Sequence, residues 1–164
     1  MTAVWRLVIV LVGLGWAQSA HALCTLLCTC TVSTTPVVFS AHNPLAAPNN
    51  DSSGSVLVQC GGTAGLLIPY TVAMGVGGGT SISARSMSSG TGRLFYNVYT
   101  TNSRTVVLGD GTGGSAVLNG SVTLDVLGTA PPQNWTIYGR IPGGQTGVAP
   151  GAYSDTLVVT VTYQ

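Results

Sequence analysis

Short runs of β-branched and aliphatic residues recur along the chain, and Gly, Ser, Asn and Pro residues fall between them. The runs follow one another at roughly 8–15 residues, which is typical of an all-β sandwich or barrel. Beyond residue 18, no stretch shows the period of an amphipathic helix. The pattern therefore predicts an all-β domain. Its strands are expected at 30–39, 54–60, 66–74, 80–84, 93–99, 104–108, 115–118, 121–126, 134–138 and 155–163.

The last of these strands has the most regular alternation. Leu157, Val159, Val161 and Tyr163 fall on one face, and the other face carries mainly threonine. An unpaired strand edge in a soluble protein is normally blunted by charge, proline or a covering segment. After Asp155 this strand has neither charge nor proline. The pattern predicts that another polypeptide segment covers it.

The N-terminus has the pattern of a secretory signal peptide. Arg6 is followed by an apolar run of about ten residues and then by a small-x-small cleavage site at residues 20–22. A membrane span would need roughly 20 apolar residues. We expect residues 1–22 to be cleaved and residues 23–164 to form a single domain, with no membrane span after cleavage.

Export allows disulfide bonds. The four cysteines are Cys24, Cys28, Cys30 and Cys60. A metal site is the competing interpretation, but the chain has neither paired Cys-x2-Cys spacing nor a histidine beside the cluster. Four cysteines allow three pairings, and the spacing by itself does not choose among them. We expect no metal site.

Charge is scarce, with no Lys and no Glu in the whole chain. Without Arg6, the four remaining Arg balance the four Asp, so the predicted mature chain is formally neutral. There is no basic stripe for nucleic acid. Low net charge also permits self-association, which suits a protein that is built into an extracellular structure.

The residues do not suggest catalysis. The sequence favours turns for Asp51, Asp110 and Asp155, and it places Asp125 in a strand run where an arginine can pair with it. His42 is expected in a loop. The glycine-rich segment 75–80 lacks the lysine and the following helix of a phosphate-binding loop. We expect no catalytic residues and no cofactor.

Several blocks of residues, in order, carry a family resemblance. They are Cys30-Thr-Val32 with Val38-Phe39 and Asn43-Pro44-Leu45, Gly54 to Cys60, Arg85-Ser-Met87 leading to Leu94–Thr100, Gly109-Asp-Gly-Thr-Gly113, Tyr138-Gly-Arg-Ile-Pro142, and Gly151 to Tyr163. Together they cover essentially the whole predicted mature chain. With these blocks the chain resembles the spore coat protein U domain family, which includes the Csu-type pilins of archaic chaperone–usher pili.

The resemblance implies an immunoglobulin-like β-sandwich that lacks its final strand. In such pilins a periplasmic chaperone fills the gap first, and the N-terminal extension of a neighbouring subunit then replaces it by donor-strand complementation. The resemblance also implies a Cys30–Cys60 disulfide, which leaves Cys24 and Cys28 as a second pair. The groove edges that it implies are Val32, Val38, Phe39, Leu157, Val159, Val161 and Tyr163.

These features predict a secreted, non-enzymatic subunit of a surface pilus or coat. Its expected partners are a periplasmic chaperone, an outer-membrane usher and neighbouring pilins. Few residues precede Cys30 after cleavage, which predicts a subunit that accepts a donor strand without offering one. A tip or terminating position, with a contribution to adhesion and biofilm formation, fits that prediction. The alternative is a stand-alone extracellular module that binds a glycan or surface through loops 41–54 and 75–80.

Overall fold

The computed structural model describes residues 28–163, and residues 1–27 and 164 lie outside the description. The predicted signal peptide and Cys24 fall in that outside part. The described part contains strands and connecting loops and no helix, as the sequence predicts. In residues 28–163 no helix is therefore long and apolar enough to cross a membrane.

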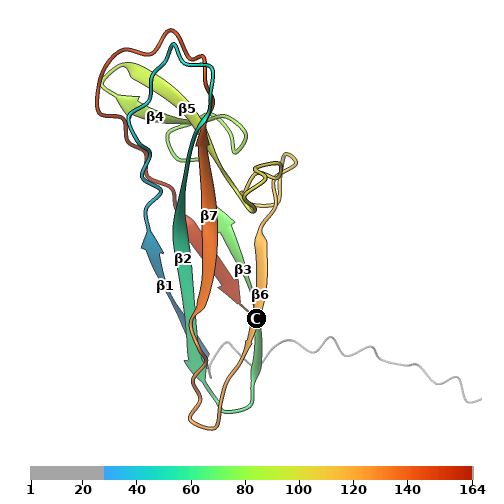
Figure 1. Cartoon of the computed structure of the whole chain (residues 1–164). Helices are drawn as coiled ribbons and strands as arrows, with labels where there is room; N and C mark the ends of the chain where they lie inside the picture. Colours follow the sequence, from blue (N-terminus) through green and yellow to red (C-terminus); the bar gives the residue numbers. More distant parts are fainter. Residues whose placement is uncertain (1–27, 164) are drawn as a thin grey trace, which may run out of the picture.

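Eight strands form two antiparallel sheets that pack against each other (Figure 1). The five-stranded sheet has the order β1-β2-β7-β5-β4, and the three-stranded sheet has the order β6-β3-β8. The strands are β1 (Cys28–Thr35), β2 (Asn50–Gly62), β3 (Leu67–Met74), β4 (Arg85–Ser89), β5 (Gly92–Tyr99), β6 (Leu118–Thr123), β7 (Gln133–Ile141) and β8 (Val159–Tyr163). This arrangement is the all-β sandwich that the sequence predicts.

The core lies between the two sheets. Val58 of β2 and Val98 of β5 face Ile68 and Val72 of β3, and all four are essentially inaccessible to solvent. Leu108, from the loop between β5 and β6, is equally buried. Burial of a Val, Leu or Ile side chain contributes about 1.5–3 kcal/mol, so this cluster holds the two sheets together.

Two predicted strands do not form, and a third is lost except for its last residue. Residues 80–84, 104–108 and 115–117 make only isolated bridges, such as the one between Leu108 and Ala116, whereas Leu118 begins β6. The sequence also missed β4, which begins at the fully buried Arg85. A charged residue at the start of a buried strand breaks the apolar pattern on which strand prediction depends.

Two predicted strands are shorter than expected. β1 stops at Thr35 because Pro36 has no backbone N–H for the ladder. β8 starts at Val159, since that residue pairs with Met74, the last residue of β3. Residues 155–158 therefore extend beyond the end of their neighbouring strand.

A disulfide joins Cys30 to Cys60, as the family resemblance implied, with a Cα–Cα distance of 4.1 Å. The two residues are also cross-strand partners in the β1–β2 ladder. The bridge therefore fixes the edge strand β1 to the interior strand β2. The expected Cys24–Cys28 pair stays a prediction, because Cys24 lies outside the described residues.

Candidate functional site: a groove between the open edges

Two strand edges border one side of the sandwich. Among the described strands, β1 pairs only with β2 and β8 pairs only with β3. Each strand thus ends its own sheet, and the two approach each other across the gap between the sheets. Figure 1 shows residues 36–49, which follow β1, and residues 142–158, which precede β8, arching over the same end of the sandwich.

Between these segments lies an open groove with a volume of about 850 Å³. One wall is formed by residues 34–42 and the other by residues 148–151 and 153–157 with Val159. The floor is apolar and comes from both sheets, and consists of Met74, Met87, Leu94, Tyr96, Val98, Ile137 and Ile141. The groove therefore opens directly onto the hydrophobic core.

The groove wall next to β1 is held against β7. Phe39 packs against the core and meets the Tyr96 ring edge to face, with 6.2 Å between the ring centroids. Gly139 of β7 leaves room for this contact, because a Cβ there would overlap Val37 and the Phe39 ring. The segment after Pro36 can therefore lie on the five-stranded sheet without joining its ladder.

The residues expected at the groove edges do not all line the groove. Val38, Phe39, Leu157 and Val159 line it, although the Val38 side chain is 71% exposed. The other three, Val32, Val161 and Tyr163, lie further along β1 and β8 and are not among the lining residues.

The alternation expected for the C-terminal strand is present in the structure. Leu157, Val159, Val161 and Tyr163 are partly buried against the core, and the residues between them are exposed. None of the four reaches the full burial seen in the middle of β3. The inward face of β8 is thus only half covered.

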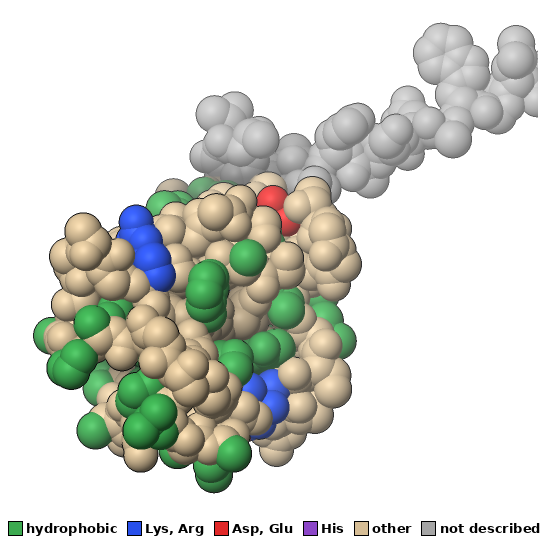
Figure 2. Space-filling model, turned by 90° about the horizontal axis from the view of Figure 1, so that it is seen from above, with side chains coloured by type: hydrophobic (Ala, Val, Ile, Leu, Met, Phe, Trp, Pro, Cys, Tyr) green, Lys and Arg blue, Asp and Glu red, His purple; other side chains and the backbone are tan. Residues whose placement is uncertain are grey.

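The groove contains one carboxylate, Asp155, and its oxygens are engaged. The Tyr96 hydroxyl donates a hydrogen bond of 2.7 Å to Oδ2, and the Gly78 N–H donates one of 2.8 Å to Oδ1. Burial raises the pKa of Tyr96, and the hydrogen bond to Asp155 acts in the same direction. The phenol therefore stays protonated and remains a donor. Figure 2 shows the molecule from above, and few charged side chains appear among the hydrophobic and uncharged atoms.

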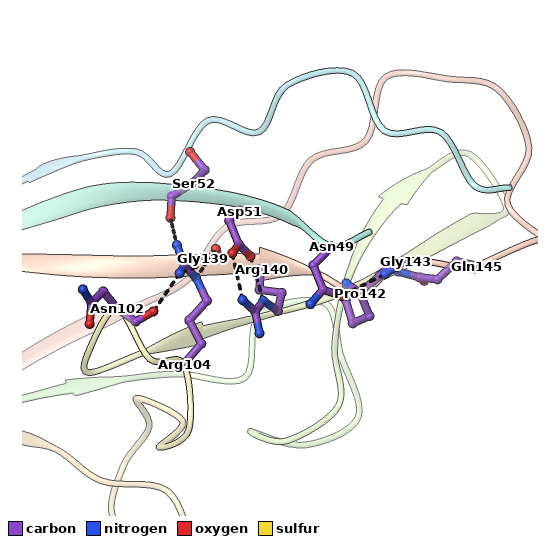
Figure 3. A network of polar contacts seen from close by, with 10 residues as sticks. All are labelled: Asn49, Asp51, Ser52, Asn102, Arg104, Gly139, Arg140, Pro142, Gly143 and Gln145. Atoms are coloured by element: carbon purple, nitrogen blue, oxygen red, sulfur yellow. Dashed lines mark hydrogen bonds and ion pairs between the residues drawn. The ribbon is translucent and has the colours of Figure 1, made fainter. Parts of the chain in front are cut away.

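Three of the other charged side chains form a network on the five-stranded sheet (Figure 3). Asp51 of β2 is bound bidentately by its cross-strand partner Arg140 of β7, at 2.7 and 2.8 Å. Arg104, from the loop after β5, approaches Asp51 to 3.3 Å and lies over the Tyr138 ring. The hydrogen bond from Arg140 and the charge of Arg104 lower the pKa of Asp51. The network ties a loop and two strands together.

Two predictions for aspartates were wrong. Asp51 was expected in a turn but lies in β2, within the ion-pair network. Asp125 was expected in a strand beside an arginine but lies in a turn, where its carboxylate accepts hydrogen bonds from Leu127 and Thr129. Both environments depend on residues that the local sequence pattern does not specify.

The other candidate residues do not assemble a reactive site. His42 lines the groove from the loop after β1. Trp135 of β7 packs against the core and donates a hydrogen bond of 3.0 Å to the Tyr70 hydroxyl. Within residues 28–163, no group of three or more His, Cys, Asp or Glu side chains is placed to hold a metal ion.

The groove and the open strand edges are consistent with the protein family that the sequence matches. The family model of the Spore Coat Protein U domain matches residues 17–160. Because the match extends over most of the sequence, the chain belongs to the Spore Coat Protein U domain family. No curated protein matches the chain.

Among solved structures, the chain is similar to one in the crystal structure of the CsuC–CsuE chaperone–tip adhesion subunit pre-assembly complex, from archaic chaperone–usher Csu pili of Acinetobacter baumannii. The identity is 24% and the TM-score is 0.54. The match covers 82% of this chain and 40% of the other, so this chain spans less than half the length of the protein that it resembles. The likeness shows a shared fold.

Proposed function

We propose that this protein is a secreted, non-enzymatic structural subunit of a surface pilus or coat, and that a β-strand from a partner completes its fold. The observation that carries the proposal is the half-covered inward face of β8 beside an apolar groove that opens onto the core. A strand inserted there would pair with the open edge of β8 and bury the groove floor.

The physical basis is β-augmentation. Backbone hydrogen bonds to an open edge supply affinity, and alternate side chains of the added strand enter pockets on the acceptor. The groove floor offers apolar contacts from both sheets, and its one carboxylate is already bonded to Tyr96 and Gly78. The groove therefore suits an uncharged strand that points every second, apolar side chain inward.

The proposed partners follow from the family and from the fold. A periplasmic chaperone would occupy the groove first, an outer-membrane usher would receive the subunit, and a neighbouring pilin would then supply the donor strand. Membership of the Spore Coat Protein U domain family and the likeness to a chaperone–tip subunit complex support this order. A tip position, with a contribution to adhesion and biofilm formation, is the finer form of the proposal.

Co-expression with the pilus chaperone of the same cell tests the proposal. The wild-type chain is expected to copurify with the chaperone as a one-to-one complex. Val159→Asp places a charge on the groove wall and should reduce the recovered complex at least about tenfold, because an unpaired carboxylate would be buried under the inserted strand.

Thr160→Asp is the matched control, because Thr160 is the next residue of β8 and faces solvent. It should leave complex formation near the wild-type level. Equal recovery of both variants, or a stable wild-type monomer that never binds the chaperone, would contradict the proposal.

A further inference from the structure

The glycine-rich segment 75–80 binds an internal carboxylate. The Gly78 N–H donates to Asp155 Oδ1 at 2.8 Å across 77 residues of sequence. The Thr156 N–H donates to the same oxygen at 2.7 Å, and the Tyr96 hydroxyl donates to Oδ2 at 2.7 Å. We call Asp155, Gly78, Thr156 and Tyr96 the Asp155 clamp.

Glycine is required at the centre of this contact. Gly77 has a φ of 67°, a region that residues with a Cβ rarely adopt. A Cβ at Gly77 would also overlap Asp155 Oδ2 and Leu157 Cδ2. The glycines therefore let the loop backbone approach the carboxylate and the chain that leads into β8.

The base of the same loop is fixed by a buried guanidinium. Arg85 is fully buried and donates from Nη2 to the Met74 carbonyl and from Nε to the Gly75 carbonyl, both at 2.9 Å. Its Nη1 donates to Asn97 Oδ1 at 2.7 Å. Removing one partner of a buried charge is costly, so the loop that holds Asp155 is firmly joined to β4 and β5.

The Asp155 clamp lies at the groove wall. Asp155, Thr156, Leu157 and Tyr96 line the groove, and β8 begins four residues after Asp155. Within the described residues, the backbone of 155–158 makes one further hydrogen bond to the β3 side, from the Gly75 N–H to the Val158 carbonyl at 2.9 Å. Ser154, next to Asp155, also exchanges two backbone hydrogen bonds with Ser88 of β4, at 2.9 and 3.2 Å. The clamp therefore joins this wall to the loop 75–80 and to β5, beside the contact that Ser154 makes with β4.

We propose that Asp155 is a positioning residue, and that its clamp holds the groove wall before β8 in the open geometry that an incoming strand needs. An open groove between apolar walls tends to close, because closure removes apolar surface from water. A fixed wall lowers the cost of ordering when the strand binds. The consequence for strand binding rests on the function proposed above.

Amide hydrogen exchange of the oxidised mature chain, read by NMR, tests the clamp without a partner. In Asp155→Ala, the Gly78 and Thr156 amides, which lose their acceptor, and the Gly75 amide, which donates to the Val158 carbonyl, should exchange at least about tenfold faster than in the wild type, as expected for local opening. Tyr96→Phe removes one hydrogen bond and keeps the ring, so it should give a smaller increase at the same amides.

Asp125→Ala is the matched control. The Asp125 carboxylate also accepts three hydrogen bonds, from Leu127 N–H, Thr129 N–H and the Thr129 hydroxyl, but all lie in one remote turn. It should accelerate exchange at Leu127 and Thr129 only. Unchanged exchange at Gly75 in Asp155→Ala, or equal acceleration there in Asp125→Ala, would overturn the proposal.

The second measurement is the rate at which the purified chain forms a complex with the pilus chaperone. Asp155→Ala should slow complex formation about tenfold, and Asp125→Ala should leave the rate unchanged. A wild-type rate in Asp155→Ala would overturn the role in strand binding. A wild-type chain that binds no chaperone would instead refute the proposed function, and the exchange contrast would still decide whether the clamp exists.

Discussion

The strands β6 and β8 flank the same central strand and reach different degrees of burial. Val72 of β3 pairs with Leu118 on β6 and with Val161 on β8. On β6, Leu118 and Val122 are 7% and 5% exposed. On β8, Val161 and its neighbours of the same face are only partly buried. Because both strands share one pairing partner, the difference comes from what covers them.

This contrast shows where the fold is open. An alternating strand gains its stability from the side chains that pack on its inward face, more than from its intrinsic propensity. The inward face of β6 is buried in the core, whereas β8 lies beside the groove. The apolar side chains of β8 are thus available for contact with an added strand.

The largest expected effect comes from releasing β1, the strand on the other side of the gap. Replacing Cys30 and Cys60 together by alanine should lower the free energy of unfolding by about 3.5 kcal/mol, as expected for a bridge that closes a loop of this length. Urea unfolding of the oxidised wild type and of the double variant measures the difference. A loss below about 1 kcal/mol would show that the β1–β2 ladder alone holds β1.

A pair of identical substitutions tests the contrast between β6 and β8 directly. Val122→Ala should lower the free energy of unfolding by about 2 kcal/mol, because the Val122 side chain is buried. Val161→Ala should lower it by about 1 kcal/mol or less, because the Val161 side chain is only partly buried. Urea unfolding of both variants measures the costs. When a strand fills the groove, the loss of unfolding free energy caused by Val159→Ala, at the β8 residue that lines the groove, should rise towards that of Val122→Ala. Equal losses of unfolding free energy for the two variants in the free protein would contradict the difference in burial between β6 and β8.

The smallest expected effect concerns the Asp51 network, away from both strands. Asp51→Asn should lower the free energy of unfolding by about 1 kcal/mol or less, because the Asp51 side chain is 35% exposed and solvent screens the pair. The lowered pKa of Asp51 means that its contribution is complete above the unfolded pKa of about 3.9 and is lost as the pH falls through the folded pKa.

Urea unfolding at several pH values measures the contribution of Asp51 to the free energy of unfolding. The difference between the wild type and Asp51→Asn should be full at about pH 6 and should shrink as the pH falls below about 4. A difference that stays constant down to about pH 2 would show that the ion pair contributes nothing and that the substitution acts through packing.

Prediction from sequence worked where a pattern is local. The alternation of 66–74 and 93–99 closely matches β3 and β5, and the alternation that ends at Tyr163 correctly gave the buried face of β8. It failed at residues 80–84 and 104–108, where β-rich runs form loops. Pairing partners decide whether such a run becomes a strand, and those partners are distant in the sequence.

The candidate site was predicted in part. The sequence placed Phe39 and Leu157 at the groove, and it also named Val32, which the groove does not reach. It rejected the glycine-rich segment 75–80 as an anion site for an external phosphate. The structure gives that segment an internal anion instead, Asp155. The signal was present in the glycines, but nothing local identifies a carboxylate 77 residues away.

The sequence by itself determined that this chain is all-β, and that its last strand has one apolar face and a chargeless edge. Both follow from alternation and composition, which act over a few residues. Only the tertiary structure decided that β1 and β8 end different sheets on the same side, that the groove opens onto the core between them, and that Asp155 fastens one wall. These features arise from contacts between distant segments, and such contacts form only when the whole chain packs.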